Sequence, residues 1–317
     1  MVLLLERLGH SLKLFSKMEN HHHHHHHHHL SSEALSASLQ TFRSTLSIGL
    51  NQLVLNSEPR SESMSLLWIQ QCLELLPMIN KAFAKLVVDI DYPISKWEDA
   101  SVEGYLKYSL NLLEFLNSIS SSLSYLGQAR LALSHALSLV ENSPSLATER
   151  LKAIQPSRFS KDCGEENKEE GHEESSCSGK DWVIHQALTE KKNIGYWVCG
   201  VVLSSLCADG KPCLEMEKLA AGGFVNSSFI GVDSSICKEL MEKGGVLKEV
   251  KEVNDAVASL EASIVTGQSS EAGEELQRRL EVFEKLLDGL GKEVDHLFAE
   301  VLAWRNKLLD SLRLQKE

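Results

Sequence analysis

Apolar residues recur at alternating steps of three and four along the stretch from Ser95 to Val140. They are Val102, Tyr105, Leu112, Leu116, Ile119, Leu123, Leu126, Leu133, Leu137 and Val140. Ser109 and Arg130 fill the two remaining positions of this heptad repeat. The pattern predicts one long helix with a single apolar seam. It would begin at the capping-box sequence Ser95–Glu98 and end before Pro144.

The same spacing recurs in four other segments of the chain. Their seam residues are Leu35, Leu39, Phe42, Leu46, Leu50 and Leu53; Ile69, Cys72, Leu76, Ile79, Phe83 and Leu86; Val246, Val250, Val253, Val257, Leu260 and Ile264; and Leu276, Leu280, Phe283, Leu287, Leu290, Val294, Leu297, Val301, Trp304 and Leu308. Short connections between such helices favour antiparallel neighbours. No segment follows the two-residue period of a strand. The sequence therefore predicts an all-α fold, a long antiparallel helical bundle with heptad-type seams and no sheet.

The polar stretches divide the chain into four parts. Residues 32–154 and 181–317 would form the N-terminal and C-terminal helical parts of the same bundle. Between them, residues 155–180 form an acidic linker, because 161–180 hold seven acids, three lysines and almost nothing apolar. Such a composition predicts disorder. Residues 1–31 combine an amphipathic segment with a polyhistidine tract and are also expected to be mostly disordered.

The N-terminal segment has three interpretations. Its apolar face is formed by Leu5, Leu8, Leu12 and Phe15. It could pack on the bundle, lie on a membrane surface or belong to an organelle transit peptide, although Glu6 and Glu19 count against the last. The histidine run His21–His29 is interpreted as a polar linker, and no physiological metal is assigned to it.

The most hydrophobic stretch is Ile194–Ala208. It is uncharged for 15 residues, whereas a helix that crosses a bilayer needs about 20. Lysines lie just before it at positions 191 and 192, and charged residues follow it at 209 and 211. We therefore expect a helix buried within the bundle; a membrane-embedded segment is the alternative.

Composition narrows the possible functions. The formal net charge is −12, which disfavours a nucleic-acid-binding surface. The seven cysteines include no C-x-x-C pair, and no secretory signal precedes them, so we expect reduced and mostly buried thiols. With 43% hydrophobic residues the chain can bury a sizeable core.

Sequence motifs for catalysis are absent. There is no phosphate-binding glycine loop, no H-E-x-x-H and no G-x-S-x-G. His135, His185 and His296 are isolated in sequence, and a lone helical histidine is usually structural. We assign no catalytic, cofactor-binding or metal-ligating residue and no cofactor, and we expect the protein not to be an enzyme.

The central stretch resembles the plant BYPASS family. Its entry sequence is Asp91–Asp99, DYPISKWED, and the Y-L-x-x-S step is Tyr105–Ser109. A leucine-rich run then leads to Leu126-Gly127-Gln128, where glycine and glutamine stand in reverse of the family's usual order. The resemblance extends from about residue 32 to the C-terminus.

This resemblance implies a role in plant root and shoot development. Similar proteins restrain a mobile root-derived signal that otherwise arrests shoot growth, and they have no established catalytic site. We therefore expect a non-enzymatic regulatory or scaffold protein that contacts other proteins through its helical faces. The alternative is an enzyme or carrier that handles a small apolar signal precursor inside the bundle. We expect it in the cytoplasm, with peripheral membrane association as an option and the plastid as the alternative.

Overall fold

The computed structural model describes residues 32–56, 64–155, 179–213, 246–267 and 269–314. Their elements are α2 (Ser32–Asn56), α3 (Leu66–Asp89), the 3₁₀ turn η1 (Ile94–Lys96), α4 (Asp99–Ser138), α5 (Pro144–Arg150), α6 (Lys180–Cys207), α9 (Lys248–Thr266) and α10 (Ser270–Leu314). Within these ranges there is no strand, so the all-α prediction is confirmed. The expectations for residues 1–31 and for residues 156–178 of the acidic linker lie outside the described residues.

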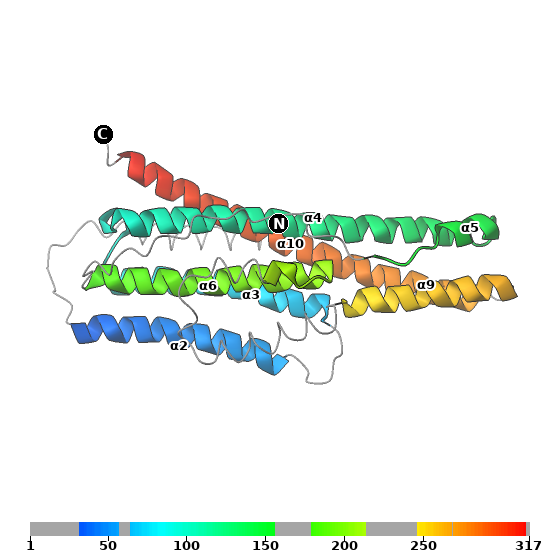
Figure 1. Cartoon of the computed structure of the whole chain (residues 1–317), viewed down its shortest axis with the longest axis horizontal. Helices are drawn as coiled ribbons and strands as arrows, with labels where there is room; N and C mark the ends of the chain where they lie inside the picture. Colours follow the sequence, from blue (N-terminus) through cyan, green and yellow to red (C-terminus); the bar gives the residue numbers. More distant parts are fainter. Residues whose placement is uncertain (1–31, 57–63, 156–178, 214–245, 268, 315–317) are drawn as a thin grey trace.

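One half of the molecule, which we call the five-helix half, is built from helices that pack against one another (Figure 1). They are α2, α3, α6, the first half of α4 and the second half of α10. Helix α2 runs antiparallel to α3, and α4 runs antiparallel to α10, since Arg305 contacts the backbone of Leu106 while Arg130 pairs with Glu284. The predicted antiparallel bundle is therefore present. Helices α6 and α10 each pack against both α3 and α4, and α3 contacts α4 through the Phe83 ring, which stacks on Tyr105 at 6.3 Å.

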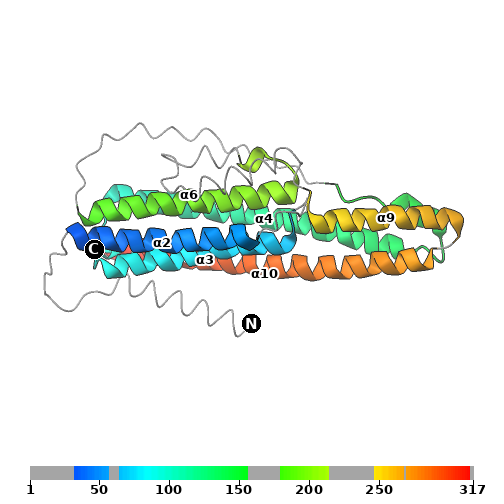
Figure 2. The ribbon, with the colours of Figure 1, turned by 90° about the horizontal axis from the view of Figure 1, so that it is seen from below.

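An arm continues beyond the ends of α2, α3 and α6 in both views (Figures 1 and 2). We use this name for the second half of α4, α5, α9 and the first half of α10. Helices α9 and α10 form a hairpin, with Gly267 in the left-handed conformation at the end of α9. The amide of Asn254 on α9 exchanges two hydrogen bonds with the backbone of Ile154, at 2.7 and 3.1 Å. This pair fixes the segment after α5 against the arm.

The arm is joined to the five-helix half where α9 and α3 begin. Glu249 is buried, and its carboxylate accepts the backbone N–H of Leu66 at 3.1–3.2 Å. The N–H of Lys248 donates to the carbonyl of Met64 at 2.7 Å. An acidic side chain from α9 thus supplies an acceptor at the positive end of the α3 dipole.

The predicted start of the long helix is wrong by three residues, because the N-cap is Glu98 and not Ser95. Ser95 lies in the 3₁₀ turn, and α4 begins at Asp99 with Glu98 as its N-cap. The cause is Trp97, whose backbone is extended and whose buried indole donates to the carbonyl of Tyr92 at 3.1 Å. Burial of this large ring outweighs a local cap, which is worth about 1 kcal/mol.

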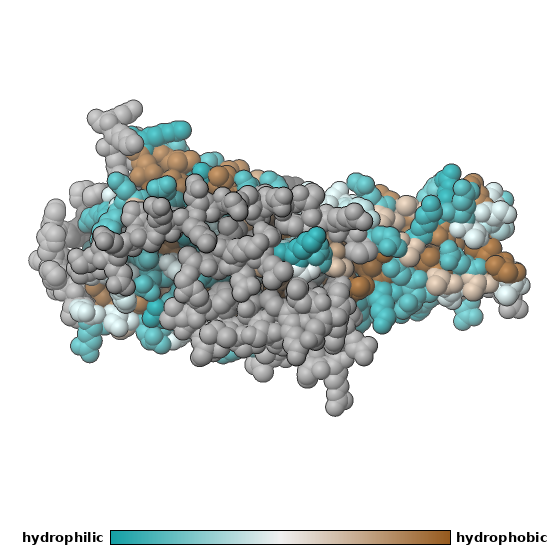
Figure 3. All heavy atoms as spheres, viewed as in Figure 1, coloured by the Kyte–Doolittle hydropathy of each residue, from teal (hydrophilic) through white to brown (hydrophobic). Residues whose placement is uncertain are grey.

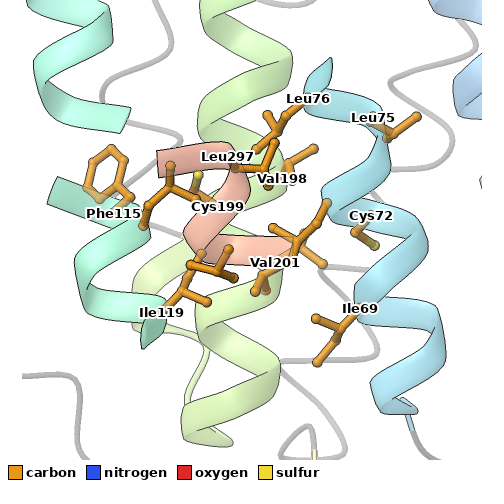
Figure 4. Close-up of a cluster of buried hydrophobic side chains, with 14 of the residues drawn as sticks. Ile69, Cys72, Leu75, Leu76, Phe115, Ile119, Val198, Cys199, Val201 and Leu297 are labelled. Carbon is orange, nitrogen blue, oxygen red and sulfur yellow. The ribbon is translucent and has the colours of Figure 1, made fainter. Parts of the chain in front are cut away.

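Helix α6 lies inside the bundle, as predicted for Ile194–Ala208. Every residue from 193 to 207 is buried. In the core, side chains of α3, α4, α6 and α10 converge; Ile69, Cys72, Phe115, Ile119, Val198, Val201 and Leu297 are among them (Figure 4). Across the described part of the chain, no helix combines the length and hydropathy that a membrane span requires. Cys72, Cys199, Cys207 and Cys213 are buried thiols, as expected.

Candidate functional site

Lys191 on α6 is an ionisable residue that lies in the interior of the bundle. Its exposed fraction is 1%, which places it among the largest fully buried side chains in the described residues. Lysine is almost never buried to this degree without a partner. Its position therefore marks the strongest candidate for a functional site in the described structure.

Four aromatic rings from three helices surround the Lys191 amine. Its Nζ lies 4.7 Å from the ring centre of Phe83 on α3 and 4.9 Å from that of Tyr105 on α4. Tyr108 on α4 and Trp304 on α10 are each at 5.7 Å. Ring faces at these distances attract a cation. We call Lys191 and these four rings the Lys191 box.

A second layer of aromatic rings holds the walls of the box in place. Trp97 packs edge-on against both Phe83 and Tyr105, at 5.8 and 6.1 Å between ring centres. Behind Phe83, at 6.3 Å, lies Phe42 of α2. These edge contacts fix the ring orientations, so the walls are positioned by packing from α2, α3 and the segment before α4.

Tyr108 fits over α6 because residue 195 is a glycine. Gly195 lies one helical turn after Lys191, and a Cβ at this position would collide with the Tyr108 hydroxyl. The Tyr108 ring also packs edge-on against Tyr196, at 5.5 Å. The phenol of Tyr196 in turn accepts the side-chain amide of Asn111, at 3.2 Å. Close approach of α4 and α6 at the box therefore depends on this glycine.

Helix α10 contributes the acidic group of the site. Glu300 is 5% exposed and lies one helical turn before Trp304, so both face the same side of α10. His296, one turn further back, is also buried. Arg305 points instead to α4, where it donates to the Leu106 carbonyl and to the hydroxyl of Ser109.

Burial controls the electrostatics of the site. Loss of water lowers the pKa of Lys191 from its ordinary 10.5 to about 7, and the Glu300 carboxylate partly opposes this shift. Burial also raises the pKa of the Tyr105 and Tyr108 phenols, so both walls are neutral at physiological pH. Lys191 can therefore exchange its proton near neutral pH, whereas its tyrosine neighbours cannot.

The thiols of Cys72 and Cys199 are poor nucleophiles at neutral pH. Burial raises the pKa of Cys199 to about 12 and that of Cys72 well above its usual value, so neither is a thiolate at neutral pH. Among the described residues no cluster of three or more histidine, cysteine or acidic side chains has the arrangement of a metal site. The chemistry available in the box is that of a desolvated amine beside a carboxylate.

The sequence pattern predicts that most of the aromatic residues of the box are buried, but it does not predict that Lys191 is buried among them. Phe83, Tyr105 and Trp304 are predicted seam residues, and all three are buried. In the sequence, Lys191 stands at the charged border of the apolar stretch Ile194–Ala208. The helical period carried the missing signal: the positions three, four and seven residues away are Ile184, Ala187, Leu188, Ile194, Gly195 and Val198. These are all apolar, so Lys191 belongs to a buried face.

The fold belongs to the class of all-α bundle proteins, and the known proteins to which the chain is similar come from plants. No family model matches the chain, and no solved structure matches it. Two proteins from rice called UPF0496 protein 4 are 26% identical to it over 289 residues (subspecies japonica) and 291 residues (subspecies indica). Each match covers 84% of this chain and 63% of the rice protein.

The particular relative that bears on function comes from Arabidopsis thaliana. It is called "Protein BPS1, chloroplastic" and is 27% identical over 301 residues, covering 89% of this chain and 85% of the relative. The resemblance to the BYPASS family is thereby confirmed over most of the chain. The chain spans less than two thirds of the length of the rice relatives, at 63%.

Proposed function

We propose that this chain is a non-enzymatic helical regulator of plant development that restrains a mobile root-derived signal. The observation that carries the proposal is the similarity to protein BPS1 over 89% of the chain. The continuous core supports it too, since side chains from four helices fill the centre of the bundle (Figure 4). Regulation would then act through contacts of helical faces with other proteins.

Outward-facing apolar side chains offer surface for such contacts. Apolar groups gather over the C-terminal end of α10 (Figure 3). On this helix Leu302 is 38% exposed, and on the neighbouring α4 Leu110 is 45% exposed. Exposed apolar side chains on helices are typical anchors for partner helices.

One observation favours the alternative of an enzyme or carrier for a small apolar precursor. The box combines a desolvated amine with a buried carboxylate, and a lysine of this kind can act as a base or form an imine with a carbonyl compound. Both candidate functions can be compared in a single capture experiment, because they require different molecules to bind.

The experiment is affinity capture from root tissue with the full chain and with Lys191→Met as matched baits. Bound proteins and bound metabolites are both analysed by mass spectrometry. A regulator that acts through its surface retains the same proteins on both baits and enriches no metabolite. A metabolite enriched on the full chain and lost from Lys191→Met would overturn the proposal and establish the carrier or enzyme.

Localisation is part of the same proposal. We propose a cytoplasmic protein whose membrane attachment, where it occurs, is peripheral and runs through residues 2–17. The name of the Arabidopsis relative supports the plastid as the alternative. Fluorescent fusions at the C-terminus, imaged in root cells beside a plastid marker, distinguish the two compartments.

A further inference from the structure

We propose that the Lys191 box is a proton-controlled clasp, which closes the end of the bundle around a neutral amine and loosens it when Lys191 gains a proton. The box lies where α3, α4, α6 and α10 meet, and Phe42 of α2 packs behind it. With an exposed fraction of 1%, the Lys191 side chain cannot hydrate its charge while the helices stay packed.

Two opposing effects act on the proton of Lys191. The four ring faces and the Glu300 carboxylate favour the ammonium. The loss of water favours the neutral amine and is the larger effect, since the pKa falls to about 7 despite Glu300. Both forms are therefore populated near neutral pH, where a small change in proton concentration changes the state of the box.

The other charged groups around the box are engaged elsewhere. Glu190, next to Lys191 on α6, pairs with Arg43 of α2 at 2.6 Å. On α10, Arg305 donates to α4. The walls from α4 are tyrosines that stay neutral, and the wall from α3 is Phe83. Glu300 is thus the acidic partner that acts on Lys191, with His296 one turn away on the same helix.

The sign of the pH effect follows from linkage. In the closed bundle the pKa of Lys191 is about 7, and in an open, hydrated state it returns to about 10.5. The open state therefore binds more protons between these values. Closure becomes more favourable as pH rises from 7 towards 10.5, and the lysine disfavours closure most at pH values below 7.

Opening is expected at α2. This helix lies at the edge of the bundle and packs on α3 and α6 (Figures 1 and 2). It also carries both contacts next to the box, Phe42 against Phe83 and Arg43 against Glu190. Displacement of α2 would remove the support behind the Phe83 ring. Movement of that ring would then let water reach the protonated amine without disturbing the α4–α10 pair.

Hydrogen exchange across α2 tests the clasp in the full chain. After correction for intrinsic exchange rates, the opening constant should fall about a hundredfold between pH 6 and pH 9, as two pKa values of 7 and 10.5 require. In Lys191→Met this dependence should disappear. The matched control is Lys192→Met, which removes the adjacent, half-buried lysine and should keep the wild-type dependence.

A second measurement requires no substitution. In protein carrying ¹³C-labelled lysine, the Cε signal of Lys191 should titrate near pH 7. The absence of any lysine signal that titrates near pH 7 would overturn the proposal. So would an equal pH dependence of α2 exchange in the wild type and in Lys191→Met.

Discussion

Leu116 and Lys191 illustrate how differently two side chains contribute to the same buried core. Leu116 is 0% exposed and lies on the predicted α4 seam, so its burial stabilises the fold. Lys191 is equally buried, but its charge costs stability unless its proton is lost. The heptad pattern predicts Leu116 because apolar periodicity records burial. It does not predict the burial of Lys191, because a buried face is recognised by its apolar residues and lysine is a charged residue.

Replacing Leu116 by alanine tests the seam at the level of one residue. We expect a loss of about 2–5 kcal/mol in the free energy of unfolding, from lost burial and from the cavity left behind. Leu110→Ala on the same helix is the control, since Leu110 is 45% exposed and should change stability by less than about 0.5 kcal/mol. Urea unfolding measures both. Equal small losses for the two variants would place the seam in solvent.

At the scale of elements, the helices with strong periodicity were predicted well and their ends were predicted poorly. The end of α9 has a local cause, because Gly267 adopts the left-handed conformation that glycine prefers. The start of α4 was predicted from Ser95 and Glu98, yet the helix begins at Asp99. There the burial of Trp97 against rings of α3 and α4 decides the geometry. Contacts of this kind are not visible in local sequence.

Two matched substitutions test the helix ends. Ala208 closes α6 with φ +47°, a left-handed conformation that is unfavourable for a residue with a Cβ. Ala208→Gly should therefore stabilise the chain by about 0.5–1 kcal/mol. Gly267→Ala at the end of α9, with φ +74°, should destabilise it by a similar amount. Thermal unfolding reports both, and changes of the same sign would contradict the assigned helix ends.

At the scale of the whole molecule, two long helices connect the five-helix half to the arm. Helices α4 and α10 run through both parts and pack against each other along the way (Figures 1 and 2). The aromatic rings of the Lys191 box come from helices that are far apart in sequence. The same is true of Glu249 and Leu66, which are joined by a hydrogen bond. This is why the bundle class could be predicted from periodicity, while the site at its centre needed the tertiary structure.

Burial of α6 in the bundle leads to a prediction about membranes. Because residues 193–207 are covered by protein, we expect alkaline carbonate to release the full chain from isolated membranes. A variant that lacks residues 1–30 should not associate with the membranes at all. Retention of that shortened variant after the carbonate wash would show that α6 inserts into lipid and would contradict its place in the bundle.

The most direct test of the proposed function is a graft experiment in Arabidopsis. Wild-type shoots are grafted onto roots that lack protein BPS1, with or without this chain expressed in the root. Lys191→Met and Leu116→Ala are included as further root lines, with protein levels measured in each. The account predicts that the chain restores shoot growth, and that Lys191→Met does so as well at equal abundance, because no chemistry at the amine is required. Continued shoot arrest above roots that accumulate the intact chain would contradict the account.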